Sequence, residues 1–221
     1  MQIYPSVLET NVETFWQQIG KLSKYFSYFQ IDIADGKFVL NKTIQIDDVI
    51  STIKQHNNIT IEKISCEFHL MVEDYLTEIE KLKKLSQFMK IKKILIHLKA
   101  LKYSKFLIPD SKFEIGLVLN PEDEIKTNWP IIKNFPAIQI MSVNPGFQGT
   151  PFLPETLNKI KELRTLGFKG MISLDGAIND KTLPIILKNK CRPDILFPGS
   201  YLKEETEKKL RILNKLIRSR Q

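Results

Sequence analysis

Two aspartates and one histidine stand inside apolar stretches of the chain, where charged side chains are unusual. Asp32 lies in IDIADG, His69 in EFHLMVE and Asp175 in ISLDG. Burying a carboxylate among apolar residues is unfavourable unless a partner offsets it. Two carboxylates and an imidazole can bind a divalent cation. Two carboxylates on opposite sides of a bound carbon can instead act as an acid–base pair, and the two roles are compatible.

Three glycine-containing segments predict a phosphate site. They read NPGFQGT over residues 144–150, DGAIN over 175–179 and PGS over 198–200. Glycine lets backbone N–H groups approach an anion closely, and helix N-termini favour negative charge. Each segment follows an apolar run of strand length, so we expect all three at the same end of consecutive strands.

The elements that must position these residues alternate along the whole chain. Expected strands cover residues 3–8, 28–34, 64–72, 94–98, 115–120, 138–143, 170–175 and 195–198. The clearest helical patterns cover 12–24 after a cap at Asn11, 76–88, 155–166 before Gly167, and 203–218. This alternation predicts an α/β fold, a TIM (β/α)8 barrel, as a single domain over residues 1–221. A doubly wound open sheet is the alternative, but no GxGxxG follows the first strand.

Polar residues at the carboxyl ends of barrel strands point to the active-site mouth. Asp32, His69 and Asp175 fall on the second, third and seventh expected strands. Simpler roles are expected for some of the others: Asp35 as a turn residue before Gly36, and His97 as a hydrogen-bonded structural residue. Glu67 is expected to face a helix and pair with a lysine. The remaining members of the set are Ser6, Gln30, Asn120, Ser142, Asn144 and Ser200.

Composition favours a protein of the cytoplasm that acts on a small molecule. The chain has 221 residues and a net charge of +8, but its lysines are spread along helix faces rather than gathered with aromatic residues. We therefore expect no nucleic-acid partner, while a positive field suits a phosphorylated substrate. Two cysteines without CxxC spacing do not predict a disulfide framework. No signal peptide and no apolar run of about 18 residues is present, so no membrane role is expected.

Taken together, these residues resemble the ribulose-phosphate 3-epimerase family. The matching segments occur in the family's order and cover nearly the whole chain: YPSVLE (4–9), IDIADGKFVLN (31–41), EFHLMVED (67–74), GLVLNPED (116–123), IMSVNPGFQGTPFLPETLNKIKELR (140–164), SLDGAIN (173–179) and PGS (198–200). The resemblance implies a TIM barrel enzyme of carbohydrate metabolism, in the pentose phosphate pathway, that forms a homo-oligomer. Its substrate would be a ketose phosphate, and its cofactor one divalent metal ion: zinc, iron, cobalt or manganese.

The resemblance also implies a role for individual residues. Asp32 and Asp175 match the two catalytic aspartates, which transfer protons at C3 through an enediolate. His69 matches a metal ligand, so the implied metal site comprises Asp32, His69 and Asp175, with Gln30 as a further candidate. The implied substrate-binding residues are Ser6, His69, Met71, Met141, Gly146, Gly149, Gly176, Ala177, Gly199 and Ser200.

The chain departs from the family pattern at four positions. Gln30 stands where the family has a metal-binding histidine, and its neutral amide oxygen is a poorer ligand for zinc-like ions than imidazole. Ala34 replaces a pocket methionine. Gln148 and Ala177 replace glycines, which preserves the backbone N–H groups provided that neither position needs a positive φ.

The expected function is interconversion of D-ribulose 5-phosphate and D-xylulose 5-phosphate by an isomerase. Two alternatives stay open. The room left by Ala34 allows an epimerase of a six-carbon ketose phosphate, and Gln30 allows a sugar-phosphate-binding barrel that has lost catalysis.

Overall fold

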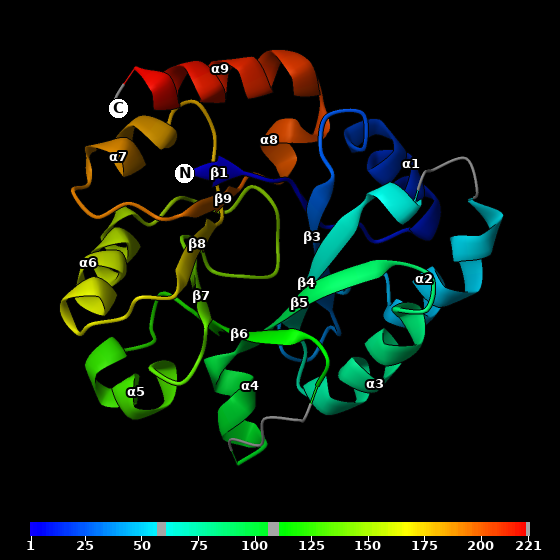
Figure 1. Cartoon of the computed structure of the whole chain (residues 1–221), viewed down its shortest axis with the longest axis horizontal. Helices are drawn as coiled ribbons and strands as arrows, with labels where there is room; N and C mark the ends of the chain where they lie inside the picture. The colour runs from blue at the N-terminus through cyan, green and yellow to red at the C-terminus, as the bar shows by residue number, and fades with distance from the viewer. Residues whose placement is uncertain (57–60, 106–110, 220–221) are drawn as a thin grey trace. The chain divides into compact units, whose positions relative to one another are not determined.

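Strands and helices alternate from one end of the chain to the other (Figure 1) in a computed structural model that describes residues 1–56, 61–105 and 111–219. By internal packing the chain divides into two compact units. Residues 5–115 form the amino-terminal unit, and residues 1–4 with 116–221 form the carboxyl-terminal unit. The single domain expected over residues 1–221 stays a prediction.

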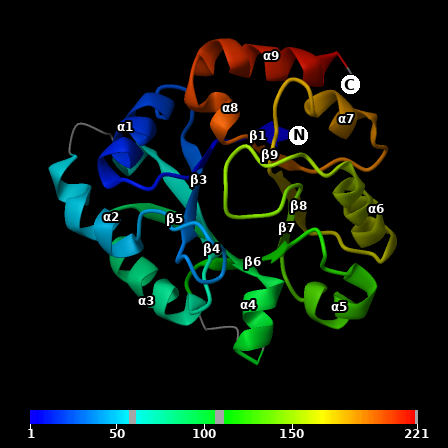
Figure 2. The same cartoon turned by 180° about the vertical axis from the view of Figure 1, so that it is seen from behind.

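The amino-terminal unit carries four parallel strands among its described residues, in the order β5-β4-β3-β2. Helices α1, α2 and α3 lie along one side of β3 and β4 in both views (Figures 1 and 2). Its elements are β2 (Ser6–Val7), α1 (Val12–Leu22), β3 (Tyr28–Ala34), α2 (Ile46–Thr52), η1 (Ile53–Gln55), η2 (Ile61–Lys63), β4 (Ser65–Met71), α3 (Tyr75–Leu85), β5 (Lys90–His97) and α4 (Leu98–Tyr103).

The carboxyl-terminal unit repeats the pattern with the strand order β1-β9-β8-β7-β6. Helices α5, α6 and α7 lie along one side of its strands (Figure 2). Its elements are β1 (Gln2–Ile3), most of β6 (Glu114–Leu119), α5 (Ile125–Ile132), β7 (Ala137–Met141), η3 (Pro154–Leu157), α6 (Asn158–Thr165), β8 (Met171–Asp175), α7 (Leu183–Lys188), β9 (Ile195–Phe197), α8 (Ser200–Lys203) and α9 (Thr206–Arg218).

This alternation of parallel strands and helices confirms the expected α/β fold of the TIM (β/α)8 barrel class. Several element boundaries differ from expectation, and β5, for example, covers Lys90–His97 rather than 94–98. The strand expected over 3–8 is two short pieces, β1 and β2, because Pro5 between them has no N–H to donate to a ladder. The helix expected over 203–218 begins later, at Thr206, as α9, and Glu205 just before it has a left-handed φ of 50°.

The interior strands are buried on both faces, as expected for parallel strands that helices cover. Every residue of β3 from Phe29 to Ala34 is buried, and so is every residue of β7. Because alternate side chains point to opposite faces of a strand, Ile31 and Ile33 occupy one face of β3 while Gln30 and Asp32 occupy the other. The polar residues of the site therefore come from the same face of successive strands.

Candidate active site

Asp32 and His69 occupy matching positions on neighbouring strands of the amino-terminal unit. Asp32 on β3 pairs in register with His69 on β4, which puts both side chains on the same face at the same level. The Asp32 carboxylate oxygen Oδ1 lies 3.0 Å from Nδ1 of His69, and both side chains are buried. The sequence named these two residues, and the structure brings them together.

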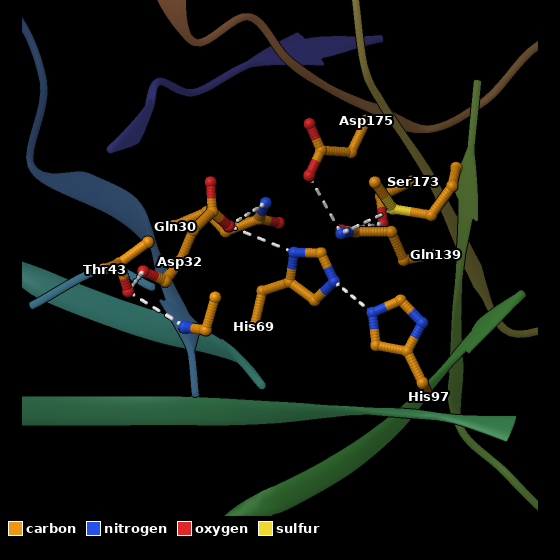
Figure 3. Close-up of polar contacts among 10 residues, drawn as sticks. Gln30, Asp32, Thr43, His69, His97, Gln139, Ser173 and Asp175 are labelled. Atoms are coloured by element: carbon orange, nitrogen blue, oxygen red, sulfur yellow. Dashed lines mark hydrogen bonds and ion pairs between the residues drawn. The ribbon is translucent and has the colours of Figure 1, made fainter. Parts of the chain in front are cut away.

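His97 extends this pair beyond the residues that the family resemblance assigned. It ends β5, and its Nε2 lies 2.8 Å from Nε2 of His69 (Figure 3). Its ring also packs against Phe38, with 4.8 Å between ring centroids, and it is fully buried. At 2.8 Å one of the two nitrogens must carry the hydrogen and the other must accept it. His97 therefore couples its own tautomer to that of His69.

Gln30 forms a hydrogen bond with Asp32. Its amide nitrogen Nε2 donates to Oδ1 of Asp32 at 3.0 Å, and the residue is fully buried. An amide N–H group has no lone pair to offer a cation. The metal-binding role considered for Gln30 stays a prediction, and the contact observed is a hydrogen bond to the Asp32 carboxylate.

A threonine that the sequence did not single out holds the end of β3 in place. The Thr43 hydroxyl accepts from the backbone N–H of Ala34 at 2.9 Å and lies 3.0 Å from the carbonyl oxygen of Asp32. Asp35 has the turn role expected of it. Its carboxylate accepts from the backbone N–H groups of Lys37, Phe38 and Glu73 and so ties the loop after β3 to the loop after β4.

Ser6 and Met71 sit beside this group. Ser6 pairs in register with Gln30, and Met71 pairs with Ala34, so each adjoins one of the positions where the chain departs from the family. Both residues are buried. Their substrate-binding roles stay predictions.

An ionic group lies one layer below His69 on the same face. Glu67 accepts a hydrogen bond from the Tyr28 hydroxyl at 2.7 Å, and its carboxylate lies 3.6 Å from Nζ of Lys93. Burial raises the pKa of Glu67, while Lys93 and the Tyr28 hydroxyl act in the opposite direction. Glu67 does pair with a lysine, but that lysine is on strand β5 and not on a helix, because Glu67 faces away from the helices.

Asp175 is the corresponding acid of the carboxyl-terminal unit. It ends β8, is buried, and its Oδ2 accepts from the amide nitrogen of Gln139 at 3.2 Å (Figure 3). Met141 ends β7 and pairs in register with Asp175, which places the expected pocket methionine beside the acid. Gln139 was not foreseen, although a single polar residue in the otherwise apolar strand AIQIM was the available signal.

The loop after β8 is held close to the loop after β7. The Ser142 hydroxyl lies 2.9 Å from the carbonyl oxygen of Asp175 and 2.7 Å from that of Gly176. Gly176 has a φ of 114°, and a Cβ there would come within 2.6 Å of Cγ2 of Val143. Only glycine fits this position without displacing its neighbour.

Ala177 has a left-handed backbone conformation, which favours glycine. Its φ is 51°, whereas Gln148 is not among the residues with positive φ. A left-handed alanine is strained, so it persists only where neighbours hold it. Here the Thr182 hydroxyl and the Asn179 amide donate to its carbonyl oxygen at 2.6 and 3.0 Å.

The remaining phosphate-site candidates belong to the same unit. Gly146 and Gly149, with φ values of 117° and 82°, form the loop after β7. Gly199 and Ser200 follow β9, which pairs with β8 in register at Asp175 and Phe197. The loops after β8 and β9 therefore leave neighbouring strands at the same end, as the sequence predicted.

The chain is similar to known proteins in sequence and in fold. The profile of the "Ribulose-phosphate 3 epimerase family" matches residues 2–202. A ribulose-phosphate 3-epimerase of Helicobacter pylori (strain J99) is 28% identical over 219 residues, covering 96% of this chain and 95% of that protein. One from Chlamydia pneumoniae is 30% identical over 90% of this chain and 86% of its own length. Among solved structures, 3-hexulose-6-phosphate synthase from Salmonella typhimurium shares the fold, with a TM-score of 0.61 at 8% identity and 100% coverage of both chains.

Proposed function

Because the chain belongs to the ribulose-phosphate 3-epimerase family and is therefore an isomerase that acts on carbohydrates, we propose that it interconverts D-ribulose 5-phosphate and D-xylulose 5-phosphate. The observation that carries the proposal is a buried carboxylate at the carboxyl end of a strand in each unit, each held by a glutamine amide. The proposal has three parts: proton transfer, a cation and a phosphate site.

Asp32 and Asp175 transfer the protons. In one direction the carboxylate of one aspartate takes the proton from C3, the C3–H bond breaks, and its electron pair passes into an enediolate. The other aspartate then gives a proton to C3 from the opposite face, which inverts that carbon. In the reverse direction the two acids exchange roles. Met71 and Met141 shelter the intermediate from water, and Ser6 hydrogen-bonds near the reacting oxygens.

A divalent cation fits the donor set. Asp32, His69 and Asp175 are buried and each offers one ligand atom, a carboxylate oxygen or an imidazole nitrogen. Such a set suits zinc, iron, cobalt or manganese, and a cation offsets the unfavourable burial of two carboxylates. When bound, it supplies Lewis-acid stabilisation of the negative charge that develops on the sugar. In our proposal these three residues hold it.

The carboxyl-terminal unit binds the phosphate group. Gly146, Gly149, Gly176, Ala177, Gly199 and Ser200 lie on the loops after β7, β8 and β9. Backbone N–H groups on such loops can surround an anion. Ala177 keeps its N–H group in a left-handed conformation, so the exchange of glycine for alanine leaves that donor in place.

The test is a coupled epimerase assay with zinc, iron(II), cobalt or manganese added in turn. We expect turnover with at least one cation, and expect Asp32→Asn and Asp175→Asn each to lower kcat by at least about 100-fold, because each removes one proton-transfer group. Asp47→Asn is the matched control, since Asp47 forms a surface ion pair with Lys81. Absence of turnover with every cation would refute the proposal.

The same preparation tests the two alternatives. Incorporation of deuterium at C3 from heavy water excludes a barrel that only binds sugar phosphates. A kcat/KM value higher for a six-carbon ketose phosphate than for the pentose would identify the hexose as the substrate.

A further inference from the structure

A buried glutamine lies beside Asp175, the acid of the carboxyl-terminal unit, at a strand position where packing alone would favour an apolar residue. Gln139 lies in the middle of β7, where all its neighbours in the strand are apolar, and it is fully buried. Burying an amide in such a place is unfavourable unless its polar atoms are hydrogen-bonded. Its nitrogen Nε2 donates to Oδ2 of Asp175 at 3.2 Å and lies 3.9 Å from Sδ of Met141.

Ser173 contacts the other end of the amide. Gln139 and Ser173 pair in register on β7 and β8, and the Ser173 hydroxyl donates to Oε1 of Gln139 at 3.2 Å. Because the amide oxygen accepts from Ser173, the amide nitrogen must point to Asp175 (Figure 3). The three side chains form one directed series, from Ser173 through Gln139 to Asp175.

We propose that Gln139 is a positioning residue for Asp175. Its N–H group holds one oxygen of the carboxylate and so keeps the carboxylate plane fixed, while the other oxygen exchanges the proton with C3. Gln139 does not itself touch the substrate, so its effect passes through Asp175 alone. This inference rests on the proposed epimerase function.

The amino-terminal unit provides a matched residue for the other acid. Gln30 is also a fully buried glutamine, and its Nε2 donates to Oδ1 of Asp32 at 3.0 Å. A change at Gln30 should therefore affect the proton transfer made by Asp32, as a change at Gln139 should affect the one made by Asp175. Methionine has a similar length and shape but no hydrogen-bond donor, which makes Gln30→Met and Gln139→Met an isosteric pair.

The experiment measures turnover in both directions with each epimer carrying hydrogen or deuterium at C3. We expect Gln139→Met to lower kcat about tenfold, the size of effect typical of losing a hydrogen bond to a charged group. The KM should change by less than about twofold, because Gln139 makes no contact with substrate in the proposal. The equilibrium constant belongs to the substrates, so kcat/KM must fall by the same factor in both directions.

The isotope effect distinguishes positioning of one acid from a general structural role. In the direction in which Asp175 removes the deuterium, Gln139→Met slows that removal. The step becomes more rate-limiting, so the isotope effect on kcat/KM rises. In the other direction Asp32 removes the deuterium and Asp175 then delivers a proton to C3. Gln139→Met slows only this delivery, so removal of the deuterium becomes less rate-limiting and the isotope effect falls. Gln30→Met should reverse the pattern. Equal changes in both directions, or unchanged kinetics, would overturn the inference.

Two further measurements keep the test decisive. If Gln139→Met does not fold, as judged by its melting temperature, Ser173→Ala takes its place, because it releases the amide while Gln139 remains. In a Gln139→Met chain that folds, Ser173→Ala should have no additional effect on kcat, since its influence passes through Gln139; independent effects would contradict the inference. If the unaltered protein shows no turnover, the proposed function itself fails, and this inference fails with it.

Discussion

At the scale of single residues, the site combines charged groups with neutral donors that orient them. Asp32 accepts from Gln30 and is contacted by His69, which in turn contacts His97. Partners of this kind fix the tautomer and ring orientation of a metal-binding histidine. If His69 presents Nδ1 to a cation, Nε2 must carry the hydrogen, and His97 must accept it.

This requirement gives a prediction for His97. His97→Leu removes the acceptor, so we expect cobalt to bind the protein about 10 to 100 times more weakly. His97→Gln should lose less, because its amide oxygen can accept from His69. Visible absorption during a cobalt titration measures both affinities. His56→Leu is the control, since His56 stacks on Trp16 and lies outside the group. Equal cobalt affinity in the unaltered protein and His97→Leu would show that His97 does not orient the ligand.

At the scale of elements, the loops after β7 and β8 contain residues with positive φ or close contacts, which not every side chain accommodates without strain. Gly176 is required by its close approach to Val143, whereas Ala177 takes up a left-handed φ despite its Cβ. The hydrogen bonds from Thr182 and Asn179 hold Ala177 in this conformation. The loop after β8 therefore stores strain next to the acid that ends the strand.

Ala177→Gly should relieve that strain. We expect the free energy of unfolding to rise by about 1 kcal/mol, because a left-handed alanine is unfavourable by roughly that amount relative to glycine. Urea unfolding measures the change. Ala100→Gly in helix α4 is the matched substitution and should have the opposite sign, since glycine lowers helix stability by about 1 kcal/mol. A loss of stability in Ala177→Gly would mean that the loop is not strained.

At the scale of the whole molecule, burial raises the pKa of two groups, one in the core and one half-buried. Cys66 is fully buried, and burial is the main reason that the pKa of its thiol lies far above the ordinary value. Burial likewise raises the pKa of Tyr28, with a further contribution from Glu67. Within the part of the chain that the structure describes, no helix is long and apolar enough to cross a bilayer.

These groups predict how stability depends on pH. Above about pH 8.5 the unfolded chain loses the Cys66 proton while the folded chain keeps it, so the free energy of unfolding falls as the pH rises. One such group contributes at most about 1.4 kcal/mol per pH unit. Urea unfolding between pH 9 and 10 should therefore show a shallower fall for Cys66→Ala than for the unaltered protein. Tyr28→Phe should reduce the slope only above about pH 10, and identical slopes for all three would contradict the prediction.

The sequence by itself determined the class of fold, and it singled out the two acids and the glycine loops as candidates for the site. Apolar runs with the length of strands alternate with helical periodicity, and that pattern depends only on local residue order. Asp32, His69 and Asp175 could be recognised because charged groups inside apolar runs are unfavourable without a purpose. The conformation of Ala177 could not be read in this way, because a positive φ at a residue other than glycine depends on the surrounding hydrogen bonds.

Only the tertiary structure decided which neutral side chains contact the acids and His69. Gln139 precedes Asp175 by 36 positions and His97 follows His69 by 28, so no local pattern links them. Parallel strand pairing brings them together, because the members of each pair lie on the same face of neighbouring strands, two positions apart in register. The direction of each amide likewise follows from its contacts in space, as Ser173 shows for Gln139. Sequence order determines which side chains each strand contains, and strand pairing determines which other side chains they contact.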